Sequence, residues 1–440
     1  MNTDTGSEPR PNFALEDWIE TQYHHCAHQM LRGISATDII KQRPGFGQSV
    51  QAHTGSVVAS PVLAAYDPEP DYFFHWYRDS ALVMDTLRIL LERGTLGDEA
   101  LQLFEEFVQF SLGLDALDGR GLVAQPQWRE RVQPAFLQYL RNDAELSQAH
   151  GEFIRAETRV NADGSLDISH WPRPQHDGIA TRALTLTRWL QLPMLDPALR
   201  ESAAGLLQAD LHYLRQHWGE PSYDLWEEDL GLHYYTLATT AAALGDEPAA
   251  ASIGQMLDDF WDAEHGYYRS RILSSGAASA KQLDIGVILA AVHTDLAGVR
   301  HSPGDPRMHA TLTRLEELFA AQYPINAQRP AGSGPAMGRY AGDVYYSGGA
   351  YYFSTLGAAE LCYLAACRMA PDAAQTWVQR GDAFLDTVRA FTPPSGDLSE
   401  QFDQRTGAQS SARHLTWSYA AFISATAARG RALAGNVTKS

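Results

Sequence analysis

The stretch Leu207-Gln-Ala-Asp-Leu-His-Tyr-Leu-Arg-Gln-His-Trp218 places its large apolar residues at positions 207, 211, 214 and 218. Intervals of three and four residues put these side chains on one face of an α-helix, whereas a half-buried strand alternates every second residue. The same spacing recurs at Leu15, Trp18, Ile19 and Cys26, at Leu101, Phe104, Phe107 and Val108, and at Phe384, Leu385 and Val388. It predicts about a dozen helices with no convincing run of alternating strands, and therefore an all-α protein.

Three long connections, 42–70, 324–349 and 391–411, concentrate glycine and proline. Loops of that length in a compact domain usually serve a function. Helix pairs can stack as an open solenoid or close into a ring, and periodicity alone does not separate the two. The long connections favour the ring, because only a closed ring brings distant loops to one mouth. With no linker and no short-period repeat, we expect one domain over residues 1–440, with ends that fray outside about 10–432.

The chain has 34 Lys and Arg residues against 53 Asp and Glu residues, a formal net charge of −19. Such a charge repels nucleic-acid phosphates and anionic membrane surfaces, so we expect neither as a partner. A neutral substrate such as a sugar is compatible with it. The oligomeric state is left open by the sequence.

The first 13 residues lack the basic start and apolar run of an export signal. The three cysteines are too few for a disulfide framework, and no run of about 18 apolar residues could span a bilayer. We therefore expect a cytoplasmic protein. His24 and His28 share a helix face as a metal-binding pair would, but no acidic residue completes a zinc-hydrolase spacing, so we expect neither a metal nor a cofactor.

Five segments carry residue types that suit sugar chemistry. The first, Asp71-Tyr-Phe-Phe-His-Trp-Tyr-Arg-Asp79, leads into a helical run. Pyranoses combine apolar C–H faces with a rim of hydroxyls, so Trp76 suits a flat wall while Arg78 and Asp79 suit binding to hydroxyls. The ordinary alternative is that Asp79 is only the N-cap of the helix.

The second segment, His170-Trp-Pro-Arg-Pro-Gln-His-Asp-Gly178, contains Trp171 and taken singly is a proline-rich turn capped by Asp177. The third segment, Tyr223-Asp-Leu-Trp-Glu-Glu-Asp-Leu-Gly231, has two adjacent carboxylates, Glu227 and Glu228, after a tryptophan. The solvated start of a helix would explain these two carboxylates equally well.

The fourth segment, Gly338-Arg-Tyr-Ala-Gly-Asp-Val-Tyr345, joins Arg339 to an anion in a loop rich in glycine and tyrosine, with a surface ion pair as the alternative. The fifth, Leu398-Ser-Glu-Gln-Phe-Asp-Gln-Arg-Thr-Gly407, contains Glu400, which alone is one loop carboxylate among many. Each segment taken singly thus has an ordinary structural explanation.

Together and in this order, the five segments closely resemble the catalytic domains of glycoside hydrolase family 15, the glucoamylases, over roughly residues 71–419. The resemblance implies an (α/α)6 barrel with the active site in loops at one end of the inner ring. It makes Glu227 the general acid and Glu400 the general base, and it places Glu228 on the aglycone side. The residues that it implies for the substrate pocket are Tyr72, Trp76, Arg78, Asp79, Trp171, Trp226, Glu228, Arg339, Tyr351, Gln401 and Trp417.

Two such carboxyls suit inverting hydrolysis of an α-glucosidic bond. One protonates the departing oxygen while the other deprotonates a water on the opposite face of the sugar, across a gap of about 6.5–9.5 Å. The resemblance has Arg78, Asp79 and Arg339 hold the terminal glucose. It therefore implies an exo-acting α-glucosidase that releases β-glucose from the non-reducing ends of α-glucans or oligosaccharides.

Some positions depart from the family pattern. The run after the acid reads Asp-Leu-Gly-Leu-His-Tyr-Tyr, Pro172 replaces a commoner glycine, and Tyr351 stands where tryptophan is frequent. These departures leave the linkage open, with isomalto-oligosaccharides, dextran ends or trehalose as alternative substrates. Outside enzymes, the alternative is a non-catalytic glucan-binding protein on the same barrel, against which the presence of both carboxylates argues.

Overall fold

The computed structural model of the chain describes residues 15–66 and 68–437. Six helices form a closed ring, because each contacts the next and the last contacts the first. In ring order they are α2 (Tyr77–Glu92), α6 (Asp177–Leu190), α8 (Tyr234–Leu244), α10 (Gly286–Thr294), α13 (Tyr352–Ala366) and α15 (Thr416–Val437). The expected ring is confirmed, and the open solenoid is excluded.

A second layer of six helices surrounds this ring, and each packs against an inner helix. These outer helices are α1 (Leu15–Leu31), α3 (Asp98–Gly113), α7 (Pro197–His217), α9 (Pro248–Asp258), α11 (Pro306–Gln322) and α14 (Pro371–Phe391). Apolar patterning separates the layers, because α13 is buried along its whole length whereas α7 buries mainly one face. The two layers make the (α/α)6 barrel that the sequence predicts.

Short helical segments occupy the connections. They are α4 (Gly119–Val123), α5 (Asp143–Gln148) and α12 (Pro324–Ala327), with 3-10 turns η1 (Pro44–Phe46), η2 (Leu114–Ala116), η3 (Pro126–Arg131), η4 (Pro134–Tyr139) and η5 (Gly151–Ala156). Residues 1–14 and 438–440, where we expect the ends to fray, lie outside the described residues, and α15 continues to Val437. No helix in the described part of the chain has the length and apolar character that a membrane span needs.

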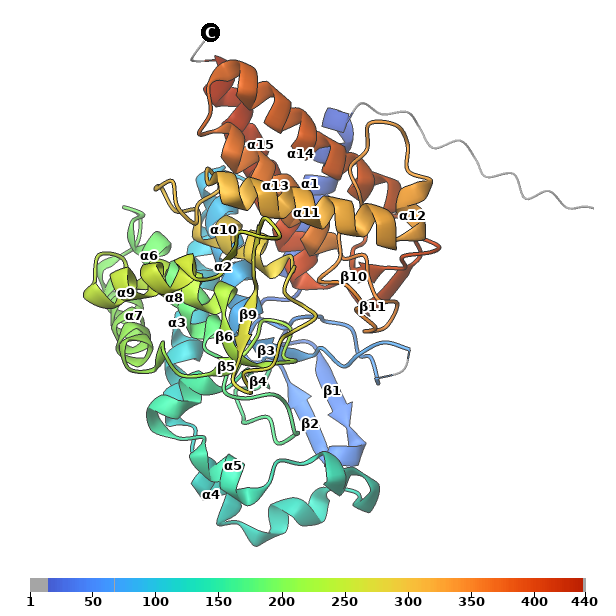
Figure 1. The fold of residues 1–440 in the computed structure, drawn as a ribbon. Coiled ribbons are helices and arrows are strands. Elements are labelled where there is room, and N and C mark those ends of the chain that lie inside the picture. The colour runs from blue at the N-terminus through green and yellow to red at the C-terminus, as the bar shows by residue number, and fades with distance from the viewer. Residues whose placement is uncertain (1–14, 67, 438–440) are drawn as a thin grey trace, which may run out of the picture.

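The connections also contain short antiparallel strands, which the helical periodicity does not predict. They are β1 (Ile40–Arg43), β2 (Gln48–Gln51), β3 (Phe74–Trp76), β4 (Arg159–Asn161), β5 (Ser222–Tyr223), β6 (Leu230–His233), β7 (Trp261–Asp262), β8 (Tyr267–Tyr268), β9 (Arg271–Leu273), β10 (Ser399–Phe402) and β11 (Gln409–Arg413). In Figure 1, β3, β4, β5, β6 and β9 lie close together on one side of the helices, with α4 and α5 beyond them. These strands hold the connections in place without changing the all-α class.

The inner helices begin close to the candidate residues. β3 leads directly into α2, and β6 leads directly into α8. Asp79 and Asp177 lie in the first turns of α2 and α6, but the N-cap positions of these helices are held by Trp76 and His176. The alternative that these carboxylates only cap helices is therefore wrong, and both bind Arg78 instead.

Candidate active site

A cavity of about 240 Å³ lies where the inner helices begin. This volume is slightly below the usual range for small-ligand pockets, about 300–1,000 Å³. Its lining includes both candidate carboxyls and most of the other candidate residues: Tyr72, Trp76, Arg78, Asp79, Trp171, Trp226, Glu227, Glu228, Arg339, Glu400 and Trp417. The fold therefore brings all five sequence segments to one place.

Glu227 lies in the turn between β5 and β6, not at the start of a helix. Its φ of 65° is in the left-handed region that non-glycine residues rarely adopt. Both carboxyl oxygens are held, because the indole N–H of Trp76 donates to Oε1 at 2.8 Å and that of Trp171 donates to Oε2 at 2.5 Å. Burial raises the pKa of this carboxyl, and the nearby charge of Arg78 lowers it.

Glu400 lies on β10 at the point where the pairing with β11 shifts between Ser399 and Gln401. Such a bulge re-aims a side chain relative to a regular strand. The Ser411 hydroxyl on β11 donates a hydrogen bond to Oε2 of Glu400. Burial raises the pKa of Glu400 to about 7, against the lowering effects of this hydrogen bond and of the Arg339 charge.

Arg78 is the centre of a buried cluster of charges. Its guanidinium donates to Asp79 at 3.0 Å and to Asp177 at 3.3 Å, and it lies 5.4 Å from the ring centre of Trp417. Burial raises the pKa of Asp177 to about 6, while Arg78 lowers it. The sequence predicts Asp177 only as a helix cap, so its ion pair with Arg78 is a contact that the sequence does not predict.

Arg339 belongs to a second cluster, and it is buried rather than part of a surface ion pair. Its guanidinium donates to both oxygens of Asp343, at 2.7 and 2.6 Å, and to Glu228 at 3.0 Å. Glu228 also accepts from Tyr340 at 2.5 Å and from Lys281 at 2.7 Å. The sequence segments contain no signal that would bring Lys281 to this point.

Two candidate residues lie behind the cavity wall rather than in its lining. The Gln401 side-chain amide donates to the Tyr351 hydroxyl at 2.9 Å, and that hydroxyl donates to Asp343 at 2.9 Å. Both side chains are fully buried. They therefore support Asp343, and through it Arg339.

The inner end of the cavity is closed by aromatic rings. Phe353 and Trp417 stack with ring centres 4.1 Å apart and planes 4° apart. Trp226 lies against both rings, and its indole N–H donates to Asp284 at 2.9 Å. Outward, the cavity adjoins an open depression of about 420 Å³ with which it shares Glu228.

A larger cavity of about 830 Å³ lies on the other side of the Phe353 and Trp417 stack. It is lined mainly by residues farther along the inner helices, whereas the smaller cavity is lined by first-turn residues of α2, α13 and α15. The buried carboxyl of Glu360 lines the larger cavity and accepts from Ser424 at 2.5 Å. Neither Glu227 nor Glu400 lines this larger cavity. The volume of a cavity therefore does not identify the candidate active site in this protein.

Among the described residues, no group of three or more His, Cys, Asp or Glu side chains could hold a metal ion. His24 and His28 are exposed on α1, and His25 between them bonds Asp397 at 3.0 Å.

Two carboxyls in one cavity with aromatic walls and clusters of charged groups are the residue types that a glycoside hydrolase site needs. The comparison of the sequence with known families agrees with this class. The chain belongs to the glycosyl hydrolases family 15, whose family model matches residues 45–115, 151–378 and 370–427.

Individual relatives cover most of the chain. Glucoamylase 1 of Rhizopus oryzae is 26% identical over 96% of this chain and 72% of its own length. A probable glucoamylase of Schizosaccharomyces pombe is 26% identical over 94% of this chain and 91% of its own length. The solved glucoamylase of Hormoconis resinae superposes with a TM-score of 0.75 at 25% identity, over 94% of this chain and 74% of that one. The chain is therefore a glycoside hydrolase.

Proposed function

We propose that the chain is an inverting, exo-acting α-glucosidase of the glucoamylase type, with Glu227 as general acid and Glu400 as general base. The observation that carries the proposal is that these two glutamates, from separate segments, line one cavity. Their hydrogen-bond partners differ. Indole donors hold both oxygens of Glu227, whereas the Ser411 hydroxyl holds Oε2 of Glu400.

Hydrolysis then follows from proton transfers between these groups and the substrate. Glu227 gives its proton to the glycosidic oxygen as the bond from that oxygen to C1 breaks. A water attacks C1 from the opposite face, and Glu400 takes a proton from this water. The new C1–OH bond has the β configuration, and the acid and base regain their starting states by exchange with solvent.

The clusters around Arg78 and Arg339 supply donors and acceptors for the hydroxyls of a terminal glucose. The Phe353 and Trp417 stack closes the inner end, so a longer chain has no exit there. This closed end supports release of single glucose units. A neutral α-glucan or α-gluco-oligosaccharide is therefore the proposed substrate.

The linkage is set where the cavity meets solvent. Pro172 lines the cavity, and the ammonium of Lys281 donates a hydrogen bond of 2.7 Å to Glu228, which also lines it. Of the possible linkages we propose α-1,4, and hydrolysis of maltose compared with isomaltose, dextran and trehalose decides between it and the alternative substrates.

With maltotetraose as substrate, the first product is expected to be β-glucose. Proton NMR recorded before mutarotation checks both the anomer and the size of the product. Early α-glucose would exclude the inverting role of Glu400. Maltose as the main first product would exclude the closed pocket.

Ser411→Ala is expected to move the acidic limb of the kcat/KM profile to higher pH. Its hydroxyl donates to Glu400 and so favours the ionised form that a general base needs. Because burial already raises the pKa of Glu400 to about 7, activity falls as the pH drops through that value. Loss of the donor raises the pKa further, by about one unit if the hydrogen bond contributes about 1.4 kcal/mol to the ionised form.

The matched control is Ser410→Ala. Ser410 lies next to Ser411 on β11, but its hydroxyl bonds Ser347 at 2.8 Å. The profile of this control should coincide with that of the parent enzyme. An unchanged acidic limb in Ser411→Ala would mean that another group controls it.

A further inference from the structure

We propose that Arg159 is a positioning residue for the general acid, because its guanidinium fixes the two indole rings that hold Glu227. The inference rests on the proposed role of Glu227. It assigns a function in the reaction to a residue that lies outside the catalytic cavity.

The fold places Arg159 directly beside both tryptophans. Arg159 on β4 pairs with Trp76 on β3 across the antiparallel ladder, and such partners project from the same face. The guanidinium carbon of Arg159 lies 3.7 Å from the ring centre of Trp171 and 4.6 Å from that of Trp76. One cation therefore touches both rings whose N–H groups donate to Glu227.

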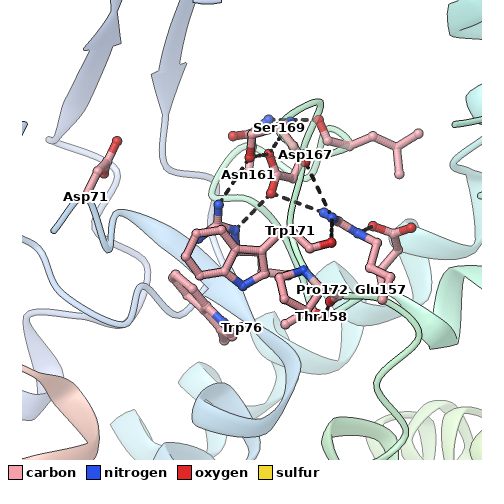
Figure 2. A network of polar contacts seen from close by, with 12 residues as sticks. Asp71, Trp76, Glu157, Thr158, Asn161, Asp167, Ser169, Trp171 and Pro172 are labelled. Atoms are coloured by element: carbon pink, nitrogen blue, oxygen red, sulfur yellow. Dashed lines mark hydrogen bonds and ion pairs between the residues drawn. The ribbon is translucent and has the colours of Figure 1, made fainter. Parts of the chain in front are cut away.

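The guanidinium is itself held in a fixed orientation. Its Nε donates to Asp167 at 2.9 Å and its Nη2 donates to Ser169 at 3.2 Å. Asp167 is fixed in turn, because it accepts from the backbone N–H and the hydroxyl of Ser169 and from Arg173. Figure 2 shows Asp167 and Ser169 above the ring of Trp171, with Trp76 below it. The side chain of Arg159 is 3% exposed, so little room remains for a second conformation.

A flat cation suits this task better than an apolar side chain. It attracts the negative faces of the indole rings, while its edge remains free for hydrogen bonds to the carboxylate behind it. The attraction fixes the direction of both N–H groups. A shift of the acid by about 1 Å would cost about 10²-fold in rate, so this orientation matters for catalysis.

The positive charge also has an electrostatic effect on the acid. Burial raises the pKa of Glu227, and the charges of Arg78 and then Arg159 lower it. The other titratable groups that interact with Glu227 are Asp79 of α2, Asp177 of α6 and Tyr72 before β3. Loss of Arg159 therefore raises the pKa of Glu227, and the basic limb of kcat/KM, where the acid loses its proton, moves to higher pH.

The test compares maltose with α-glucosyl fluoride in Arg159→Gln. Fluoride departs with little help from an acid, so a misplaced acid slows maltose far more than the fluoride. We expect a loss of about 10²-fold on maltose, and a fall of roughly tenfold or more in the ratio of maltose to fluoride turnover. Asp167 keeps Arg173 and Ser169 as partners in the variant, which favours folding.

Arg43→Gln is the matched control. Arg43 is as buried as Arg159, bonds Asp71 at 2.7 Å and lies 3.8 Å from the ring centre of Phe74, which Arg159 also touches. Its ring contact in the described residues is with Phe74 and with neither tryptophan. This control should leave the maltose to fluoride ratio and the basic limb unchanged.

Arg159→Lys separates the two effects. Lysine keeps the charge but loses the flat face, so the basic limb should stay in place while maltose turnover falls. Equal slowing of both substrates in Arg159→Gln, or the same ratio change in Arg43→Gln, would overturn the inference. Glu227→Gln, measured in parallel, tests the proposed function itself. If this variant shows no preference for the fluoride, the assignment of Glu227 as the acid fails, whatever the result for Arg159→Gln. If it shows the preference and Arg159→Gln does not, only the inference about Arg159 fails.

Discussion

Glu227→Gln is expected to slow maltose hydrolysis by about 10²- to 10⁴-fold. The amide keeps the size and shape of the carboxyl but cannot give a proton to the glycosidic oxygen. Its side-chain oxygen can still accept from one of the two indoles, Trp76 or Trp171. The fold and glucose binding should therefore change little, which near-UV circular dichroism and a glucose titration check.

The decisive measurement for this variant uses α-glucosyl fluoride. A good leaving group hardly needs protonation, so Glu227→Gln should keep much more of its activity on the fluoride than on maltose. Equal losses on both substrates would contradict the role of Glu227 as the acid. Undiminished maltose hydrolysis would place the catalytic pair elsewhere.

The fold was largely predictable because helical spacing is a local property. Residues such as Leu207, Leu211 and Leu214 lie on the buried face of α7, as their intervals require. The closure of the ring depends on contacts such as that between α15 and α2, which no local pattern contains. The strands could not be predicted from the sequence, because each is only two to five residues long and too short to show an alternating pattern.

The residues that line the cavity could be predicted only as a set, through the family resemblance. The contacts that these residues make could not be predicted. The sequence predicts Asp177 as a helix cap, yet it accepts from Arg78 on the neighbouring helix α2. Lys281 has no motif around it, and it reaches Glu228 because β9 and the loop after it lie beside β6. Tyr351 and Gln401 belong to the predicted set but act from behind the wall, through Asp343.

Burial alone does not divide the catalytic roles. It raises the pKa of both carboxyls, and it raises that of Glu360 in the other cavity to about 8. In the proposed mechanism the two roles differ instead in the reaction partner, which is a leaving oxygen for Glu227 and a water for Glu400. For that reason substrate dependence separates the two glutamates better than their titration does.

Glu360→Gln is the matched control for a buried glutamate. Its carboxyl accepts from a serine hydroxyl, that of Ser424, as Glu400 accepts from Ser411. It lies, however, in the larger cavity beyond the Phe353 and Trp417 stack. Since burial keeps this carboxyl largely neutral near pH 7, the amide should leave hydrolysis unchanged.

Glu400→Gln is expected to lose about 10²- to 10⁴-fold on maltose and by a similar factor on α-glucosyl fluoride. The amide still accepts from Ser411, so the bulge in β10 and the cavity wall should persist. It cannot take a proton from the attacking water, and a better leaving group does not replace that step. Initial rates on both substrates, beside Glu227→Gln and Glu360→Gln, measure the difference. If Glu400→Gln is the variant that recovers on the fluoride, the acid and the base are reversed.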